Sequence, residues 1–118
     1  VGAAPLNVPV EEITVSGAAP TAISWQLKSG ALRYDVARGN VANLAPGVGT
    51  VDLGTVVCIE NDSPNVDTVG SEDVVNPLAG EAFFYLWRGT QGKNIGPGSY
   101  GTSTAGDERT ASAGDCAN

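Results

Sequence analysis

Hydrophobic and polar residues alternate in two neighbouring stretches near the start of the chain. Both stretches, 22–28 and 32–38, place an apolar residue at every second position. These residues are Ile23, Trp25 and Leu27 in the first stretch and Leu32, Tyr34 and Val36 in the second. A period of two is typical of a strand with one face on a core and one face in water. We therefore predict two strands, with the face that carries Arg33, Asp35 and Ala37 in solvent.

An aromatic stretch at 82–104 holds five of the seven aromatic residues of the chain. Residues 83–87 form a short apolar run, which favours a buried strand over a helix. Glycine, asparagine and proline follow up to Gly98, so the chain is expected to turn there. Residues 99–104 contain the tyrosine and threonines of a returning strand. The stretch is predicted to be a hairpin whose aromatic strand is central to a β core.

The remaining chain predicts further short strands and many turns. Strands are expected at 11–16 and 51–59, and loops at 39–50 and 60–80, the second loop with a short strand near 66–69. The sequence contains 16 Gly and 7 Pro, and few segments have the length and composition of a stable helix. A chain of 118 residues fits one domain. We predict an all-β domain with little or no helix, whose strand spacing is typical of a sandwich.

The N-terminal segment 1–10 is predicted to be extended and separate from the β domain at 11–118. Pro5 and Pro9 oppose a helix and are compatible with an extended or edge conformation. One interpretation is a linker or a frayed terminus. The other is a strand that contacts a neighbouring subunit, because Leu6, Val8 and Val10 alternate with polar residues and prolines.

The charge balance excludes several partners. The net charge is −7, from 13 acidic and 6 basic side chains. Such a surface repels phosphate backbones and anionic lipid, so binding to nucleic acid is not expected. No run of residues approaches the length of a membrane-spanning helix. The charge is interpreted as a source of solubility, with binding of divalent cations as the alternative.

The two cysteines, Cys58 and Cys116, predict a disulfide. The chain contains no His, and neither Cys belongs to a CxxC motif, which opposes a thiolate zinc site. A bridge between a strand and the C-terminal tail is the better interpretation. It implies an oxidising compartment, and we predict a secreted protein of the cell surface.

Catalytic motifs are sparse. Without histidine, the Ser-His-Asp and Cys-His arrangements are excluded. Lys28 and Lys93 are the only lysines, and neither lies in a recognisable motif. Residues 96–101 match GxGxxG by letter, but the glycine, threonine and serine that follow do not favour the helix which a dinucleotide site requires. We predict that the chain is not an enzyme and uses no cofactor.

The acidic loop after Cys58 offers a weak cation site. Glu60, Asp62 and Asp67 could supply oxygen ligands to Ca²⁺, but their spacing fits no 12-residue calcium loop. Solvated loop charges are the simpler interpretation. Asn61-Asp62-Ser63 also matches a glycosylation sequon, a weak signal because Pro64 follows.

Several motifs resemble a fibronectin-type-III-like module of bacterial secreted and cell-surface proteins. They are YDVARG from Tyr34, CIEND from Cys58, and AGEAFFYLWRG followed by GSYGTSTAGDER. The resemblance covers 11–118 and implies an antiparallel two-sheet sandwich of about seven strands, without a catalytic site of its own. It also implies that both cysteines are structural. Related modules often have another Cys where this chain has 92–94, and its absence leaves Cys58 and Cys116 to pair with each other.

The resemblance also predicts which side chains face the core. Five aromatic residues are expected to build it: Trp25, Tyr34, Phe83, Tyr85 and Trp87. The alternate residues Phe84 and Leu86 then lie on the outer face, where a sandwich strand normally carries polar side chains. A covering element is therefore expected, either the N-terminal segment, the 39–50 loop or another subunit.

These features predict a structural module that assembles with copies of itself or with a partner protein. A subunit or domain of a surface filament or a pilus-like polymer fits best, with Leu6, Val8, Val10, Phe84 and Leu86 as the possible interface. The alternative is an adhesion module that binds carbohydrate or another surface through the loops at one end of the sandwich. Tyr100 is the only loop aromatic that could serve that purpose.

Overall fold

The computed structural model describes residues 13–15, 19–46, 49–90, 99–102 and 106–117. These residues form eight strands and one short 3-10 helix, with no α-helix among them, which confirms the predicted all-β class. The elements are β1 (Ile13–Val15), β2 (Ile23–Trp25), β3 (Arg33–Asn40), η2 (Val41–Asn43), β4 (Ala45–Pro46), β5 (Thr50–Asp52), β6 (Val57–Ser63), β7 (Phe83–Thr90) and β8 (Glu108–Thr110). In this part of the chain, no helix is long and apolar enough to cross a membrane.

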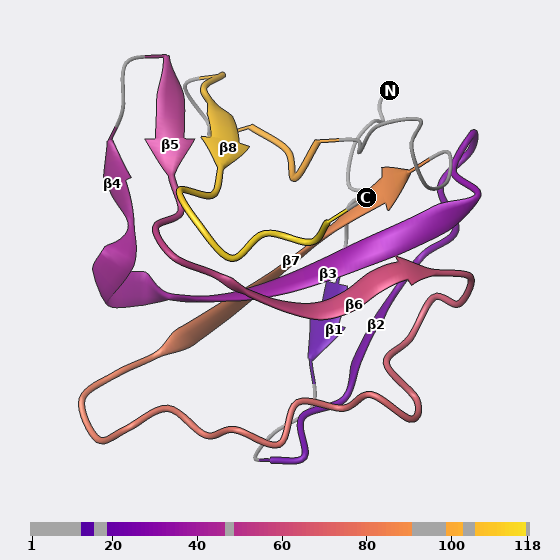
Figure 1. Ribbon diagram of the computed structural model, residues 1–118, viewed down its shortest axis with the longest axis horizontal. Helices are drawn as coiled ribbons and strands as arrows, with labels where there is room; N and C mark the ends of the chain where they lie inside the picture. The colour runs from indigo at the N-terminus through magenta and orange to yellow at the C-terminus, as the bar shows by residue number, and fades with distance from the viewer. Residues whose placement is uncertain (1–12, 16–18, 47–48, 91–98, 103–105, 118) are drawn as a thin grey trace, which may run out of the picture.

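A central sheet with the order β6-β3-β7 organises the fold (Figure 1). β3 and β7 pair antiparallel along their whole length, from Arg33 opposite Thr90 to Asn40 opposite Phe83. The aromatic strand is therefore as central as predicted, but the predicted hairpin is wrong. Among the described residues of its return strand, Thr102 bridges to Glu108 instead of pairing with β7.

One face of the central sheet is covered by β1, β2 and the segment 66–73. β1 pairs antiparallel with β2, and β2 pairs loosely with 66–73 on its other side. The Thr68 amide, for example, donates to the Ile23 carbonyl at 3.0 Å. The core below these strands contains Ile23, Trp25, Tyr34, Val36 and Trp87, and we call it the first core.

The opposite face of the central sheet carries a second core. Its buried residues are Ala37, Leu53, Val56 and Tyr100, with Phe84, Leu86 and Ala111 packed against them. The alternation around Tyr34 predicted that Asp35 and Ala37 on this face are in solvent, and that prediction is wrong because both are buried. The 41–56 region and the C-terminal tail cover it, and Figure 1 shows their strands β4, β5 and β8 grouped on the side away from β1 and β2.

The predicted strand at 51–59 is divided into β5 and β6. Leu53 and Val56 turn into the second core between the two strands, and Gly54 has a positive φ of 75°. That conformation is available to glycine at little cost. The break redirects the chain from the sheet β4-β5-β8 into the central sheet.

The C-terminal tail runs parallel to the segment 50–58 in one constant register. Thr50 pairs with Glu108, Asp52 with Thr110 and Thr55 with Ala113, each with the sequence separation of 58 that also separates Cys58 from Cys116. Backbone hydrogen bonds continue between the paired residues, including one from the Val56 amide to the Ala113 carbonyl at 2.9 Å. The disulfide therefore closes a parallel ladder that already aligns its two cysteines.

Gly114 allows this close approach, which leads to a prediction about its replacement. A Cβ at Gly114 would lie 1.9 Å from the Val56 carbonyl oxygen, and the residue has a φ of +80°. Gly80 has a similar φ of +84° but open space around its Cβ position, so Gly80→Ala is a matched control for the backbone conformation. We expect Gly114→Ala to lower the free energy of unfolding by about 1–3 kcal/mol more than Gly80→Ala. Urea unfolding of both variants measures the difference, and equal losses would contradict the close packing of the tail.

Candidate functional site

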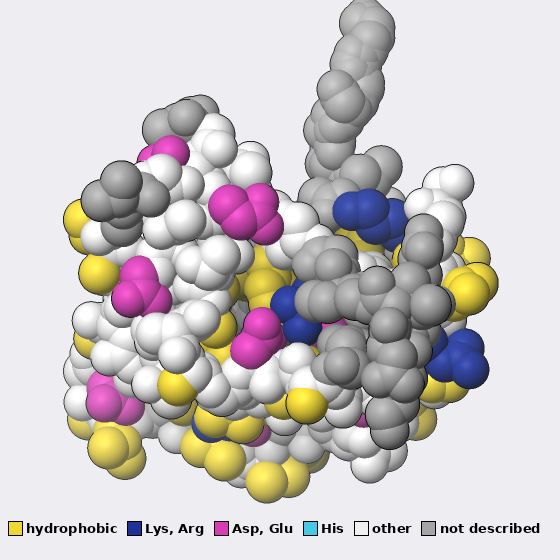
Figure 2. All heavy atoms as spheres, turned by 45° about the horizontal axis from the view of Figure 1, so that its top comes forward, with side chains coloured by type: hydrophobic (Ala, Val, Ile, Leu, Met, Phe, Trp, Pro, Cys, Tyr) yellow, Lys and Arg dark blue, Asp and Glu magenta, His cyan; other side chains and the backbone are white. Residues whose placement is uncertain are grey.

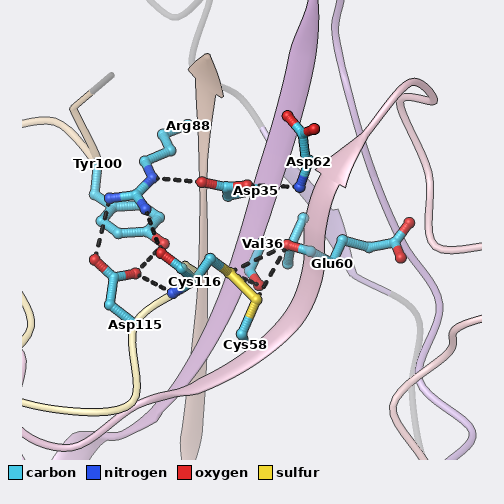
Figure 3. The surroundings of a disulfide bond; sticks show 9 residues. All are labelled: Asp35, Val36, Cys58, Glu60, Asp62, Arg88, Tyr100, Asp115 and Cys116. Carbon is cyan, nitrogen blue, oxygen red and sulfur yellow. Dashed lines mark hydrogen bonds and ion pairs between the residues drawn. A yellow bond between two sulfur atoms is a disulfide. The ribbon is translucent and has the colours of Figure 1, made fainter. Parts of the chain in front are cut away.

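The Cys58–Cys116 disulfide predicted from the sequence is confirmed, with an S–S distance of 2.01 Å. Cys116 is buried, although it belongs to a tail that otherwise has many exposed residues. The Cys116 Sγ lies 3.2 Å from the Glu60 carbonyl oxygen, a packing contact because a disulfide sulfur carries no proton. The bridge joins the tail to β6 on the second-core side of the central sheet (Figure 3).

A buried carboxylate, Asp35, lies in the middle of β3 and is completely inaccessible to solvent. Its Oδ1 accepts a hydrogen bond from the Asp62 amide at 2.8 Å, and its Oδ2 accepts one from Arg88 Nε at 2.8 Å. Asp62 has a positive φ of 60° and lies where the β3–β6 register shifts. This irregularity points a backbone amide at the carboxylate. A buried charge needs such partners to offset its lost hydration.

Arg88 connects this carboxylate to the C-terminal tail. It lies directly opposite Asp35 in the β3–β7 ladder. Its Nη1 pairs with Asp115 Oδ2 at 3.1 Å, and its Nη2 donates to the Cys116 carbonyl at 3.2 Å. The guanidinium also stacks over the Tyr100 ring at 4.5 Å. One planar side chain thus holds β3, the tail and the second core together, a use that suits the rigid fork of arginine.

The electrostatics of this cluster keep Arg88 charged and Tyr100 neutral. Burial by itself would lower the pKa of Arg88, but the hydrogen bond to Asp35 and the nearby carboxylates outweigh burial and raise this pKa. Burial raises the pKa of Tyr100, and the hydrogen bond that its hydroxyl donates to Asp115 at 2.7 Å raises it further. We call Asp35, Arg88, Tyr100 and Asp115 the Arg88 network. Figure 3 shows that it adjoins the disulfide.

A second charged cluster surrounds Asp73, near the other end of β3. Arg38 Nη1 lies 2.8 Å from Asp73 Oδ1, and the Tyr85 hydroxyl donates to Asp73 Oδ2 at 2.8 Å. Burial would raise the pKa of Asp73, but the hydrogen bonds from Arg38, Tyr85 and the Val75 amide outweigh it and lower this pKa. Burial and the bond to Asp73 raise the pKa of Tyr85 to about 12. This cluster ties the segment after β6 to the central sheet.

The structure places the five predicted core aromatics as follows. Trp25, Tyr34 and Trp87 pack in the first core, with ring centroids 5.8–6.2 Å apart. Tyr85 is partly buried against this core. Phe83 differs from the prediction, because it is half-buried outside the core cluster with the Arg38 guanidinium 4.6 Å above its ring.

The outer-face residues Phe84 and Leu86 are covered by their own chain. They pack against the second core, and the Phe84 ring lies so close to Gly39 that a Cβ there would be 2.0 Å from it. Of the three alternative covering elements, another subunit is therefore not required, because Leu53, Val56 and Ala111 of the same chain belong to this cluster. Leu6, Val8 and Val10 lie outside the described residues.

The weak calcium candidates are not brought together into a site. Within the ranges that the structure describes, no three His, Cys, Asp or Glu side chains are grouped to hold a metal ion. Asp67 accepts a hydrogen bond from the nearby Val69 amide, which is typical of a turn. Asp62 contributes its backbone to Asp35.

Exposed apolar residues are concentrated on the segment that joins β6 to β7. Val69, Val74 and Leu78 expose 74%, 75% and 72% of their surface. Figure 2 shows apolar side chains gathered along the lower edge of the molecule, the side on which Figure 1 places this segment. These residues are the clearest surface feature that internal packing does not explain.

Comparison with protein-family models, with curated proteins and with solved structures finds no match for this chain.

Neither the Arg88 network nor the Asp73 cluster was predicted from the sequence. Asp35 was assigned to a solvent-facing position, and Arg88 was placed on the outer face. One signal was present. Asp35 lies between Tyr34 and Val36, and Arg88, of opposite charge, directly follows the aromatic run 83–87. Without the strand register, however, the sequence does not reveal that Asp35 and Arg88 are directly opposite each other.

Proposed function

We propose that this chain is a non-catalytic, extracellular structural module that assembles with copies of itself in a surface filament or a pilus-like polymer. The observation that carries the proposal is the exposed apolar set Val69, Val74 and Leu78. Isolated exposed apolar residues are ordinary, but several on one segment are characteristic of an interaction surface. A chain with a net charge of −7 has little need of such a surface unless a partner covers it.

The internal construction supports a structural role. We interpret the layer of β1, β2 and 66–73 and the sheet β6-β3-β7 as the two sheets of a fibronectin-type-III-like sandwich, with the sheet β4-β5-β8 as an addition to it. The disulfide, the parallel tail and the Arg88 network all join the C-terminal end to the central sheet. These contacts suit a module that must keep its shape under load. The disulfide also supports an oxidising, extracellular setting.

The carbohydrate-binding alternative loses its main residue. Tyr100 is only 5% exposed, and its hydroxyl is bonded to Asp115. It therefore serves the second core and not an open loop surface. No other observation favours that function.

The proposal predicts that the full chain self-associates through its apolar segment. We expect light scattering to show concentration-dependent assembly, and Leu78→Ser to weaken it. Leu27→Ser is the matched control, because Leu27 is 79% exposed but lies just after β2, outside the β6–β7 segment. Electron microscopy of the native material should show polymers. Discrete monomers in both measurements, or equal effects of the two substitutions, would contradict the proposal.

A further inference from the structure

β6 has an open edge in the described part of the chain. It pairs with β3 on one side, and β6 is the outermost strand of the sheet β6-β3-β7. With seven residues it is also one of the longer strands. Such an edge presents backbone groups that another strand can pair with. Its first residues adjoin the C-terminal tail through the Cys58–Cys116 disulfide, and its second half is partly protected by the irregularity at Asp62 and by Pro64, which follows.

The first core is incompletely covered next to this edge. Ile59 of β6 and Val66 of the following segment both pack against the first core but are only partly buried. Val69, three residues further, is 74% exposed. A strand added to β6 with apolar side chains on this face would therefore bury surface that the chain itself leaves accessible.

The proline positions in the N-terminal segment fit an edge-pairing strand. In an extended strand, successive residues direct their amides to opposite edges and their side chains to opposite faces. Pro5 and Pro9 are an even number of residues apart, so in an extended strand both missing amides belong to the same edge. Leu6, Val8 and Val10 retain their amides on the other edge and carry the apolar face. Such a strand can add to a sheet by one edge only, and its prolines oppose further growth.

Geometry favours a second copy as the source of this strand. β1 and the segment 66–73 lie on opposite sides of β2, which places them about 10 Å apart. β6 belongs to the facing layer, and face-to-face layers lie about 10 Å apart. Three residues span at most about 11 Å, which is less than these two spacings combined, and this favours β6 of a second copy as the partner of residues 6–10.

We propose that residues 6–10 of one copy pair with the open edge of β6 in the next copy, and that Leu6, Val8 and Val10 cover Ile59, Val66 and Val69. This interface is head-to-tail, so each copy offers a further donor and a further acceptor, and the contact extends into a polymer when its rotation does not close a ring. The backbone pairing supplies affinity, and the alternating side chains fix the register. The inference rests on the proposed function and names one contact of the assembly, to which Val69 of the exposed apolar set belongs.

Two neighbouring proline substitutions in the full chain test the pairing. Val8→Pro removes an amide from the edge that pairs, whereas Asn7→Pro removes one from the edge that does not. We expect sedimentation velocity to show loss of self-association for Val8→Pro and its retention for Asn7→Pro. On the receiving side, Val69→Asp should abolish association, while Leu27→Asp, at a similarly exposed residue away from β6, should not. Unchanged circular dichroism spectra establish that all four variants are folded.

Mixing the defective variants identifies the head-to-tail contact. The Val69→Asp chain keeps an intact donor segment, and the Val8→Pro chain keeps an intact β6 edge. An equimolar mixture should therefore give a dimer, although each variant alone is monomeric. Equal behaviour of Val8→Pro and Asn7→Pro, or a monomeric mixture, would overturn this inference but leave assembly by another contact. A monomeric wild-type chain would remove both this contact and the proposed function.

Discussion

Arg88→Met is expected to lower the free energy of unfolding by about 3–5 kcal/mol. The substitution removes the charged hydrogen bond from Arg88 Nε to the Asp35 carboxylate, which remains fully buried beside the Asp62 amide. It also removes the contacts that Arg88 makes with Asp115 and with the Cys116 carbonyl. Because a domain of this size is stabilised by only about 6–18 kcal/mol, the loss is a large part of the total. Urea unfolding followed by tryptophan fluorescence measures it.

A double variant separates the loss of the Asp35–Arg88 ion pair from the loss of packing around Arg88. Asp35→Asn with Arg88→Met removes both charges and keeps a carbonyl oxygen that can accept the Asp62 amide. We expect this double variant to recover most of the stability, because replacing both partners of a buried ion pair is often close to neutral. Arg33→Met is the control for loss of an arginine. Arg33 is exposed and lies in β3, so this substitution should change the free energy of unfolding little. A small effect of Arg88→Met by itself would contradict a buried ion pair in solution.

Removal of the disulfide by Cys58→Ala with Cys116→Ala is expected to cost about 4 kcal/mol, since the closed loop spans 58 residues. The parallel ladder from Thr50 to Ala113 should still hold the tail in the native state. Hydrogen exchange should therefore show earlier opening of residues 108–116 than of β3 and β7. Both measurements compare the double variant with the oxidised chain.

Reduction of the wild-type chain provides the control for this second prediction. It breaks the same bond without changing side-chain volume, so reduced protein and double variant should unfold at similar urea concentrations. Cys116 is buried, and reduction should be slow unless the tail opens. If the oxidised and reduced chains were equally stable, the tail would be held by the ladder and the Arg88 network alone.

Local patterns predicted a strand well where its own residues were sufficient to identify it. The alternation around Tyr34 and the aromatic run before Gly89 identified β3 and β7. The same alternation failed at Leu27, which is 79% exposed because β2 already ends at Trp25. A period of two indicates a strand but does not show where a partner strand stops.

The sequence by itself determined the all-β class, most of the first core and the disulfide. These depend on residue types and short-range periodicity, which a linear pattern contains.

Only the tertiary structure decided that the face predicted to be polar is buried. The charge of Asp35 is tolerated there because Arg88, 53 residues away in the chain, is brought directly opposite it. Likewise, Phe84 and Leu86 pack against a second core that includes Leu53 and Val56 and the tail residue Ala111, and the tail is placed there by the parallel register that ends at Cys58 and Cys116. The strand register decides which distant side chains meet, and no local sequence pattern contains the register.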